Sequence, residues 1–178
     1  GTFFKNKPLH LTVFSNPGYQ FVGWEGVSDS TTITYHCAMD TTFIAVFDVS
    51  NEFILPEVIE ENTTLTNVHP YVVIQDLLIP SNILLTIQEG VELRMFHGSN
   101  IHVEGQLLIN GTEENPIQII AHNSIENNRW GAICFTNALD TSYISHTKIS
   151  GASTGVNPSA HHGAISSINS HIVISHIE

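Results

Sequence analysis

The amino-acid sequence predicts an all-β protein, with a small β-grasp-like module followed by a truncated right-handed parallel β-helix. Composition is the first indication, because charged residues form only 12 % of the chain, about half of the roughly 25 % typical of soluble domains. Thr, Ser and Asn supply the missing polarity, which suits strands. Almost no segment repeats apolar residues at helical spacing. From Tyr71 onward, short apolar runs separated by Gly and Asn predict closely spaced strands.

The charge of the chain excludes one class of partner. Five Lys and Arg stand against seventeen Asp and Glu, which gives a formal net charge of −12. A chain of this charge is repelled by phosphate-rich surfaces, so we exclude nucleic acid as a main partner. No segment stays apolar for the roughly 18 residues that a membrane span needs. Cys37 and Cys134 fall in separate predicted modules, so we expect buried thiols and no disulfide between them.

The first fifty residues show the alternation of half-buried strands. Residues 9–13 read Leu-His-Leu-Thr-Val, and residues 42–47 read Thr-Phe-Ile-Ala-Val-Phe. An Asn-Pro-Gly turn at 16–18 leads into a further strand at 19–22. This segment therefore predicts a small unit of short strands.

Aromatic residues are concentrated in this small unit. We expect Tyr19, Phe21, Trp24, Phe43 and Phe47 to form one small core. The alternative is that Tyr19 and Trp24 stack on sugars, which makes these two residues the candidate ligand-binding residues.

Two stretches of the unit carry a family resemblance. Residues 16–26 read Asn-Pro-Gly-Tyr-Gln-Phe-Val-Gly-Trp-Glu-Gly, and residues 39–47 read Met-Asp-Thr-Thr-Phe-Ile-Ala-Val-Phe. Together they resemble the divergent InlB B-repeat (Listeria–Bacteroides repeat) modules. The resemblance implies a β-grasp-type spacer of bacterial surface proteins, without catalytic residues. We assign residues 1–50 to this module and residues 51–70, which are rich in Glu, Asn and Thr, to a linker and N-terminal cap.

The remaining residues, 71–178, contain an internal repeat. Gly-Ala-Ile at 131–133 recurs 32 residues later at 163–165, and Tyr-Ile-Ser-His at 143–146 returns loosely, 30 residues later, as Val-Ile-Ser-His at 173–176. Strands this short must stack on copies of themselves to bury an apolar face. We therefore expect coils of a β-helix that is incomplete at its C-terminal end.

About a hundred residues of this region resemble a second family. Residues 70–91 follow the pattern Pro-Tyr-x-Val, Ile-x-Ile-Pro, Leu-Thr-Ile-x-x-Gly-Val, and residues 101–135 continue the likeness. The pattern is similar to the N-terminal coils of secreted bacterial right-handed β-helix (pectin-lyase-like) proteins. The resemblance implies a secreted or cell-surface location. It is specific for fold and uninformative for function, because such helices carry enzymes, adhesins and inert stalks.

No acid and base pair stands out for catalysis, so we assign no catalytic residues. After residue 115 the acidic residues are Glu126, Asp140 and Glu178, and the cations are Arg129 and Lys148. Polysaccharide-cleaving β-helix enzymes need clustered carboxylates. We interpret Asp140 as a turn residue that bonds its own backbone.

Histidines form the candidate metal site. His146 and His176 occupy equivalent places on successive coils, about 4.8 Å apart. Together these two residues are candidate ligands of a transition-metal ion. His162, and also His161 or His171, are further candidate ligands. An outward ladder without metal is the interpretation we favour, and we assign no cofactor.

Three functions remain open. The first is a non-catalytic structural or adhesion module of a larger bacterial protein, in contact with extracellular polysaccharide or host and cell-surface glycan. The second is the N-terminal part of a polysaccharide lyase or glycoside hydrolase whose active site lies beyond Glu178. The third is a metal-binding surface module that uses His146 and His176. We also expect self-association through the open end of the β-helix.

Overall fold

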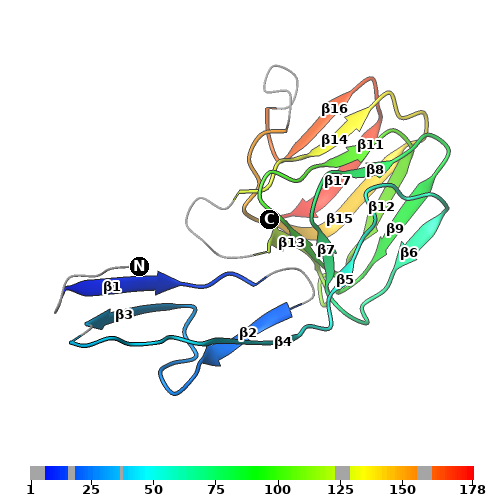
Figure 1. The fold of residues 1–178 in the computed structure, drawn as a ribbon. Coiled ribbons are helices and arrows are strands. Elements are labelled where there is room, and N and C mark those ends of the chain that lie inside the picture. The colour runs from blue at the N-terminus through cyan, green and yellow to red at the C-terminus, as the bar shows by residue number, and fades with distance from the viewer. Residues whose placement is uncertain (1–6, 16–18, 37, 123–128, 156–161) are drawn as a thin grey trace. The chain divides into compact units, whose positions relative to one another are not determined.

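The structure, a computed structural model, describes residues 7–15, 19–36, 38–122, 129–155 and 162–178. It divides into two compact units, Gly1–Asn51 and Glu52–Glu178. All regular elements of the described residues are β-strands (Figure 1). The all-β fold class predicted from the sequence is therefore confirmed. None of these elements is a helix long and apolar enough to span a membrane.

The first unit contains two antiparallel strand pairs. Its strands are β1 (Pro8–Thr12), β2 (Tyr19–Trp24), β3 (Thr32–His36) and β4 (Ala45–Val49). Strand β1 pairs with β3, and β2 pairs with β4 through a register shift between Phe21 and Gly23. Each sheet has only two strands, and two-stranded sheets are marginally stable by themselves.

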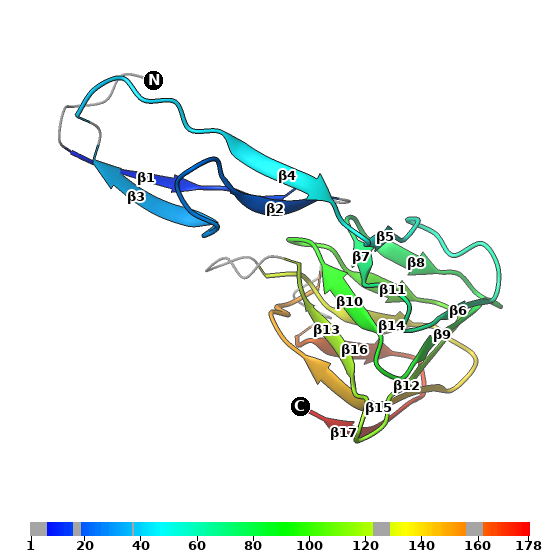
Figure 2. The same cartoon turned by 90° about the horizontal axis from the view of Figure 1, so that it is seen from below.

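The second unit is a stack of short parallel strands, best followed in Figures 1 and 2. Its strands are β5 (Phe53–Ile54), β6 (Thr63–Leu65), β7 (Tyr71–Val73), β8 (Leu77–Ile79), β9 (Leu84–Gln88), β10 (Glu92–Met95), β11 (Ile101–Val103), β12 (Gln106–Asn110), β13 (Ile117–Ala121), β14 (Ile133–Thr136), β15 (Ser142–Ile149), β16 (Ile165–Ile168) and β17 (Ile172–Ile177).

Two sheets build this unit. One runs in the order β5-β7-β10-β13-β15-β12-β9-β6, with β17 added on β15, and the other runs β16-β14-β11-β8. Neighbouring strands in both sheets are parallel. The first sheet curls because β15 pairs with β12 through residues 143–145 and with β13 through residues 147–149. A curled sheet of parallel strands is the arrangement of a partial parallel β-helix.

One apolar core runs through the stack. Alternate residues of each strand point inward, so Leu77 and Ile79 on β8 are fully buried, and Ile101 and Val103 on β11 lie next to them in register. The same cluster extends from Leu55 to residues of the later coils. Full burial of such a side chain contributes about 1.5–3 kcal/mol, so each additional coil stabilises the previous one.

The stack starts earlier in the chain than Tyr71. Residues 51–70 were predicted to be linker and cap, and in the structure β5 and β6 within this segment pair in parallel with β7 and β9. The side chain of Asn62 also accepts a hydrogen bond from the Leu84 amide at 2.9 Å. Apolar Leu55 and Leu65 explain the difference, because they are buried on the core of the first coil.

Asparagine side chains support several corners of the stack. Asn137 and Asn169 have φ angles of 53° and 50°, in the left-handed region that Asn tolerates, and Asn169 Nδ2 donates to Asn137 Oδ1 at 3.1 Å. Asn100 is buried, donates to the Gly98 carbonyl at 3.0 Å and accepts from the Ala132 amide at 3.1 Å. Asn100 thus bonds the backbone of its own coil and of the next coil.

Candidate functional site

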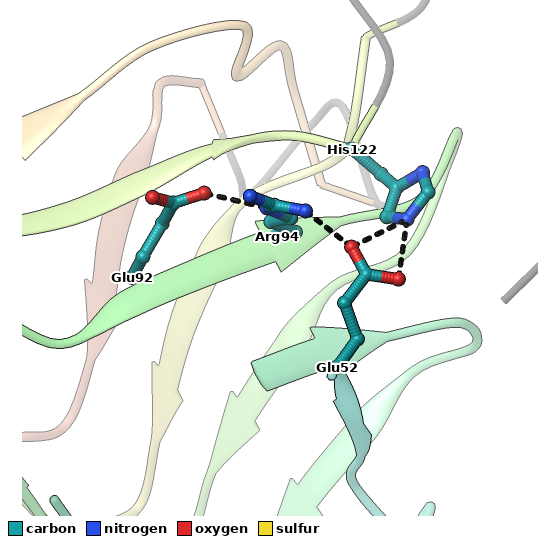
Figure 3. A network of polar contacts seen from close by, with 4 residues as sticks. All are labelled: Glu52, Glu92, Arg94 and His122. Atoms are coloured by element: carbon teal, nitrogen blue, oxygen red, sulfur yellow. Dashed lines mark hydrogen bonds and ion pairs between the residues drawn. The ribbon is translucent and has the colours of Figure 1, made fainter. Parts of the chain in front are cut away.

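A network of charged side chains lies on the outer face of the first sheet (Figure 3). Arg94 and Glu92 point outward on β10 because their neighbours Leu93 and Met95 point into the core. Glu52 comes from just before β5, and His122 follows β13. The four side chains therefore come from the three coils of β5, β10 and β13, and β7 lies between β5 and β10 in the same sheet.

The Glu52 carboxylate is the centre of this network. Its side chain is only 5 % exposed, and it accepts a hydrogen bond from Arg94 Nη1. His122 Nε2 lies 3.3 Å from the same carboxylate, and the His122 side chain is also 5 % exposed. On its other side, Arg94 Nε donates to Glu92 Oε1 at 2.5 Å. The charged side chains of the network thus bond to one another and do not point into an open cavity.

The Arg94 guanidinium is the cation that satisfies this network. Partial burial alone would lower the pKa of Arg94, but the hydrogen bonds and charges of Glu92 and Glu52 outweigh burial and raise it. Arg94 therefore stays charged, and the buried carboxylate of Glu52 depends on this cationic partner. The arrangement fastens three coils together, and the occupied oxygens of Glu52 do not offer a free general base.

A second polar group lies on the outer face of the other sheet. Asp76 Oδ1 accepts hydrogen bonds from the backbone and side-chain nitrogens of Asn100 at 2.8 and 2.9 Å, and Asp76 Oδ2 lies 3.2 Å from His102 Nε2. Burial would raise the pKa of Asp76, yet the bonds from Asn100 and His102 dominate and lower it.

Cys134 lies beside His102, in register on the next coil. The thiol is free and buried, as predicted, and burial raises the pKa of Cys134 above its usual value. A raised pKa disfavours the thiolate, which is the nucleophilic form. The side chains of Cys134, His102 and Asp76 are therefore neighbours without forming an activated nucleophile. Cys37 lies outside the described residues.

The structure brings the candidate metal ligands His146 and His176 together as a stacked pair. Their ring centroids are 4.3 Å apart and the rings are inclined by only 3°. Both residues have left-handed φ angles, 46° and 52°, at the corner between two faces of the stack. A histidine nitrogen binds a metal in its own ring plane at about 2.0–2.1 Å. Two stacked, parallel planes do not meet, so a shared ion would require rotation of a ring.

The structure does not bring the other candidate histidines into a metal site with this pair. His162 and His171 are exposed, and His161 lies outside the described residues. Within the described part of the chain, no group of three or more His, Cys, Asp or Glu residues is arranged to hold a metal ion. The metal site therefore stays a hypothesis based on the sequence.

The two candidate ligand-binding residues of the first unit differ in exposure. Trp24 is 9 % exposed, packs edge-on against Phe21 and Phe43, and donates its Nε1 hydrogen to the Ser30 carbonyl at 3.0 Å. Tyr19 is 51 % exposed. Trp24 thus takes the core position expected of it. The expectation that Tyr19 belongs to the same core is wrong, because half of this residue is exposed.

Two cavities of similar volume lie on the described part of the second unit. One, of about 560 Å³, lies among β5, β6, β7 and the segments between them. The other, of about 550 Å³, lies beside the stacked pair His146 and His176 and includes the exposed ion pair of Lys148 with Glu178 at 2.9 Å.

The sequence did not reveal the Glu52 network or the first cavity. Glu52 and His122 are separated by 70 positions, and no local pattern connects them. The sequence could have indicated only that Glu92 and Arg94 lie on the same face, because residues two apart on a strand share a face.

In comparisons with known proteins, no family model, no curated protein and no solved structure matches this chain.

Proposed function

We propose that this chain is a non-catalytic structural and adhesive module of a secreted or cell-surface bacterial protein, and that it contacts glycans. The observation that supports this most is the unbroken parallel register of the coils. Leu77, Ile101, Ile133 and Ile165 follow one another on β8, β11, β14 and β16. A stack of this kind presents a continuous lateral surface of parallel strands, which suits display and adhesion.

The ionisable side chains support the same proposal. Glu52, Arg94 and His122 bond to one another across three coils, and Asp76 is engaged by Asn100 and His102. These groups strengthen the stack. In a glycoside hydrolase or lyase we would instead expect a pair of carboxylates that flank the bond to be broken.

Affinity electrophoresis through gels that contain neutral or acidic polysaccharides tests the adhesive role. We expect at least one polysaccharide to retard the chain, and overnight incubation with the same polysaccharides to release no new reducing ends and no unsaturated products. Release of either product would replace this proposal with the lyase or hydrolase alternative.

Self-association through the last coil is part of the proposal. Ile174 on β17 pairs in register with the buried Ile144, but Ile174 is 44 % exposed, and Val173 beside it is 48 % exposed. Exposed apolar strands favour pairing with another chain. Sedimentation velocity should therefore show concentration-dependent dimers that Ile174→Lys abolishes. A monomer at all concentrations would remove this element of the proposal.

A further inference from the structure

The cavity among the first coils has the size and composition of a small-molecule site. Its volume is about 560 Å³, within the range of about 300–1,000 Å³ that such sites span. The buried side chains of Leu55, Ile59 and Leu65 form part of its wall. Its remaining wall combines aromatic rings with carboxylates and hydroxyls.

Three rings form a fixed platform in this cavity. Phe53 is stacked on His69, with ring centroids 5.5 Å apart and an angle of 20°. Tyr71 packs edge-on against both rings, at 5.9 Å from Phe53 and 4.5 Å from His69. The Tyr71 hydroxyl donates to the Thr66 carbonyl at 3.1 Å and accepts from the Thr66 amide at 3.2 Å. The platform is therefore held in place before any ligand binds, which lowers the entropic cost of binding.

The Phe53 ring is the accessible part of the platform. Phe53 is 51 % exposed although it belongs to a strand of the first sheet. An aromatic face carries partial negative charge and attracts the slightly positive C–H groups of a ligand. One face of a pyranose ring presents such C–H groups.

Carboxylates line the same cavity. Glu60 and Glu61 are exposed and line the cavity together with Thr63 and Thr64. Of the described residues that line the cavity, none is Lys or Arg. Carboxylates accept hydrogen bonds from sugar hydroxyls and repel a sugar that carries its own carboxylate. The charge of the site therefore selects against uronic acids.

We infer that this cavity binds one neutral pyranose unit of a glycan, with the C–H face of the sugar on Phe53 and its hydroxyls on Glu60 and Glu61. The inference rests on the proposed function, since it names the glycan-binding site and the class of sugar. The site lies at the first coils of the stack. Of the described residues that line it, none belongs to the stacked histidines or to the charged network, although Glu52 directly precedes Phe53 in the chain.

Isothermal titration calorimetry on the full chain tests the inference with three probes: tetramers of β-1,4-linked glucose, of N-acetylglucosamine and of galacturonate. We expect binding of one or both neutral tetramers and at least tenfold weaker binding of galacturonate. Phe53→Leu should weaken the neutral tetramers at least tenfold. The matched control is Tyr143→Leu on β15, because Tyr143 is 47 % exposed, and it should bind like the unmodified chain.

A double variant, Glu60→Gln with Glu61→Gln, provides an independent test at two exposed positions. It should narrow the difference between the neutral tetramers and galacturonate at least threefold. Unfolding midpoints of all variants should equal that of the unmodified chain, which separates binding from folding.

The outcomes distinguish the site from the general function. Binding of neutral tetramers that survives Phe53→Leu and the double variant would reject this site and leave the glycan-binding role intact. Tighter binding of galacturonate than of the neutral tetramers would also reject the site. Absence of binding by the unmodified chain, in calorimetry and in the polysaccharide gels, would reject both.

Discussion

The unit Gly1–Asn51 and the unit Glu52–Glu178 are both built of short strands, but they bury apolar side chains very differently. Among the described residues of the first unit, Trp24 is the buried large hydrophobic residue, whereas Phe47, Val49 and Ile44 are 39 %, 71 % and 52 % exposed. The second unit has a continuous core of fully buried Leu, Ile and Val. The comparison teaches that strand content alone does not make a core.

The two units differ because their strands have different numbers of neighbours with which to share apolar burial. Each strand of the first unit has one partner in a two-stranded sheet. Strand β10 of the second unit has β7 on one side and β13 on the other, and its inward residues Leu93 and Met95 join the shared core. Two-stranded sheets are marginal by themselves, whereas stacked coils share the burial of each added residue.

The largest expected effect concerns this core. Leu93→Ala should lower the free energy of unfolding of the second unit by about 2–5 kcal/mol, because it leaves a cavity at a position with 0 % exposure. Urea unfolding in a Trp24→Phe background measures it, since the fluorescence then reports on the buried Trp130. Val49→Ala in the same background is the control, and a surface change of this kind should cost less than about 0.5 kcal/mol. Equal losses would contradict the comparison of the two units.

The charged network should be the next most important element. Arg94→Ala leaves the carboxylate of Glu52 buried without its cation. Complete loss of a buried partner costs about 3–5 kcal/mol, and we expect about 1–3 kcal/mol because Arg94 is partly exposed. The same urea titration measures this loss.

Lys148→Ala is the matched control for Arg94→Ala, because Lys148 and Glu178 form an exposed pair with side chains 53 % and 75 % exposed. Exposed pairs contribute about 0–1 kcal/mol. If both variants lost the same amount of stability, the three coils would not depend on the network.

A smaller effect is expected at the corners of the stack. Asn137 has a φ of 53°, a left-handed conformation that costs a residue with a Cβ about 1–2 kcal/mol. Asn137→Ala keeps this cost and removes the side chain that can form a local hydrogen bond. Asn137→Gly should cost less, because glycine adopts this conformation freely. Thermal unfolding should therefore rank the unmodified chain first, the Gly variant second and the Ala variant last. Because both variants lose the bond to Asn169, a Gly variant less stable than the Ala variant would contradict the importance of the left-handed φ at this position.

The smallest effect concerns acid stability. The pKa of Asp76 is lowered in the folded chain, so Asp76 contributes stability above its unfolded pKa of about 3.9 and loses that contribution as the pH falls through the lower folded value. Asp76→Asn should reduce stability at pH 7 and flatten the decline between pH 4 and the folded pKa. Melting temperatures at pH 7, 4 and 3 measure this, with the exposed Glu104→Gln as the charge control. An unchanged decline in Asp76→Asn would contradict the role of Asn100 and His102.

The repeat in the sequence predicted much of the register of the second unit. The two copies of Gly-Ala-Ile become paired strands in which Ile133 lies opposite Ile165. The loose repeat at 143–146 and 173–176 likewise becomes the pairing of Tyr143 with Val173. Repeated segments occupy equivalent places because each coil must match the apolar face of the coil before it.

The candidate site was less predictable for a physical reason. His146 and His176 were expected to be neighbours, and they are, because both belong to repeated strands. Glu52 and Arg94 belong to no repeat, and they lie 42 positions apart. The cavity around Phe53 also depends on residues 51–70, whose irregular sequence concealed their pairing with the first coils.

By itself, the sequence determined that the chain is all-β and that its second part repeats in coils, because strand periodicity and repeat spacing are local properties. Only the tertiary structure decided which outward side chains meet. Adjacent coils differ in length, with 24 positions between Asp76 and Asn100 and 32 between Asn100 and Ala132. Loops absorb these differences, so neighbours on the outer face are fixed by stacking in three dimensions and not by spacing along the chain.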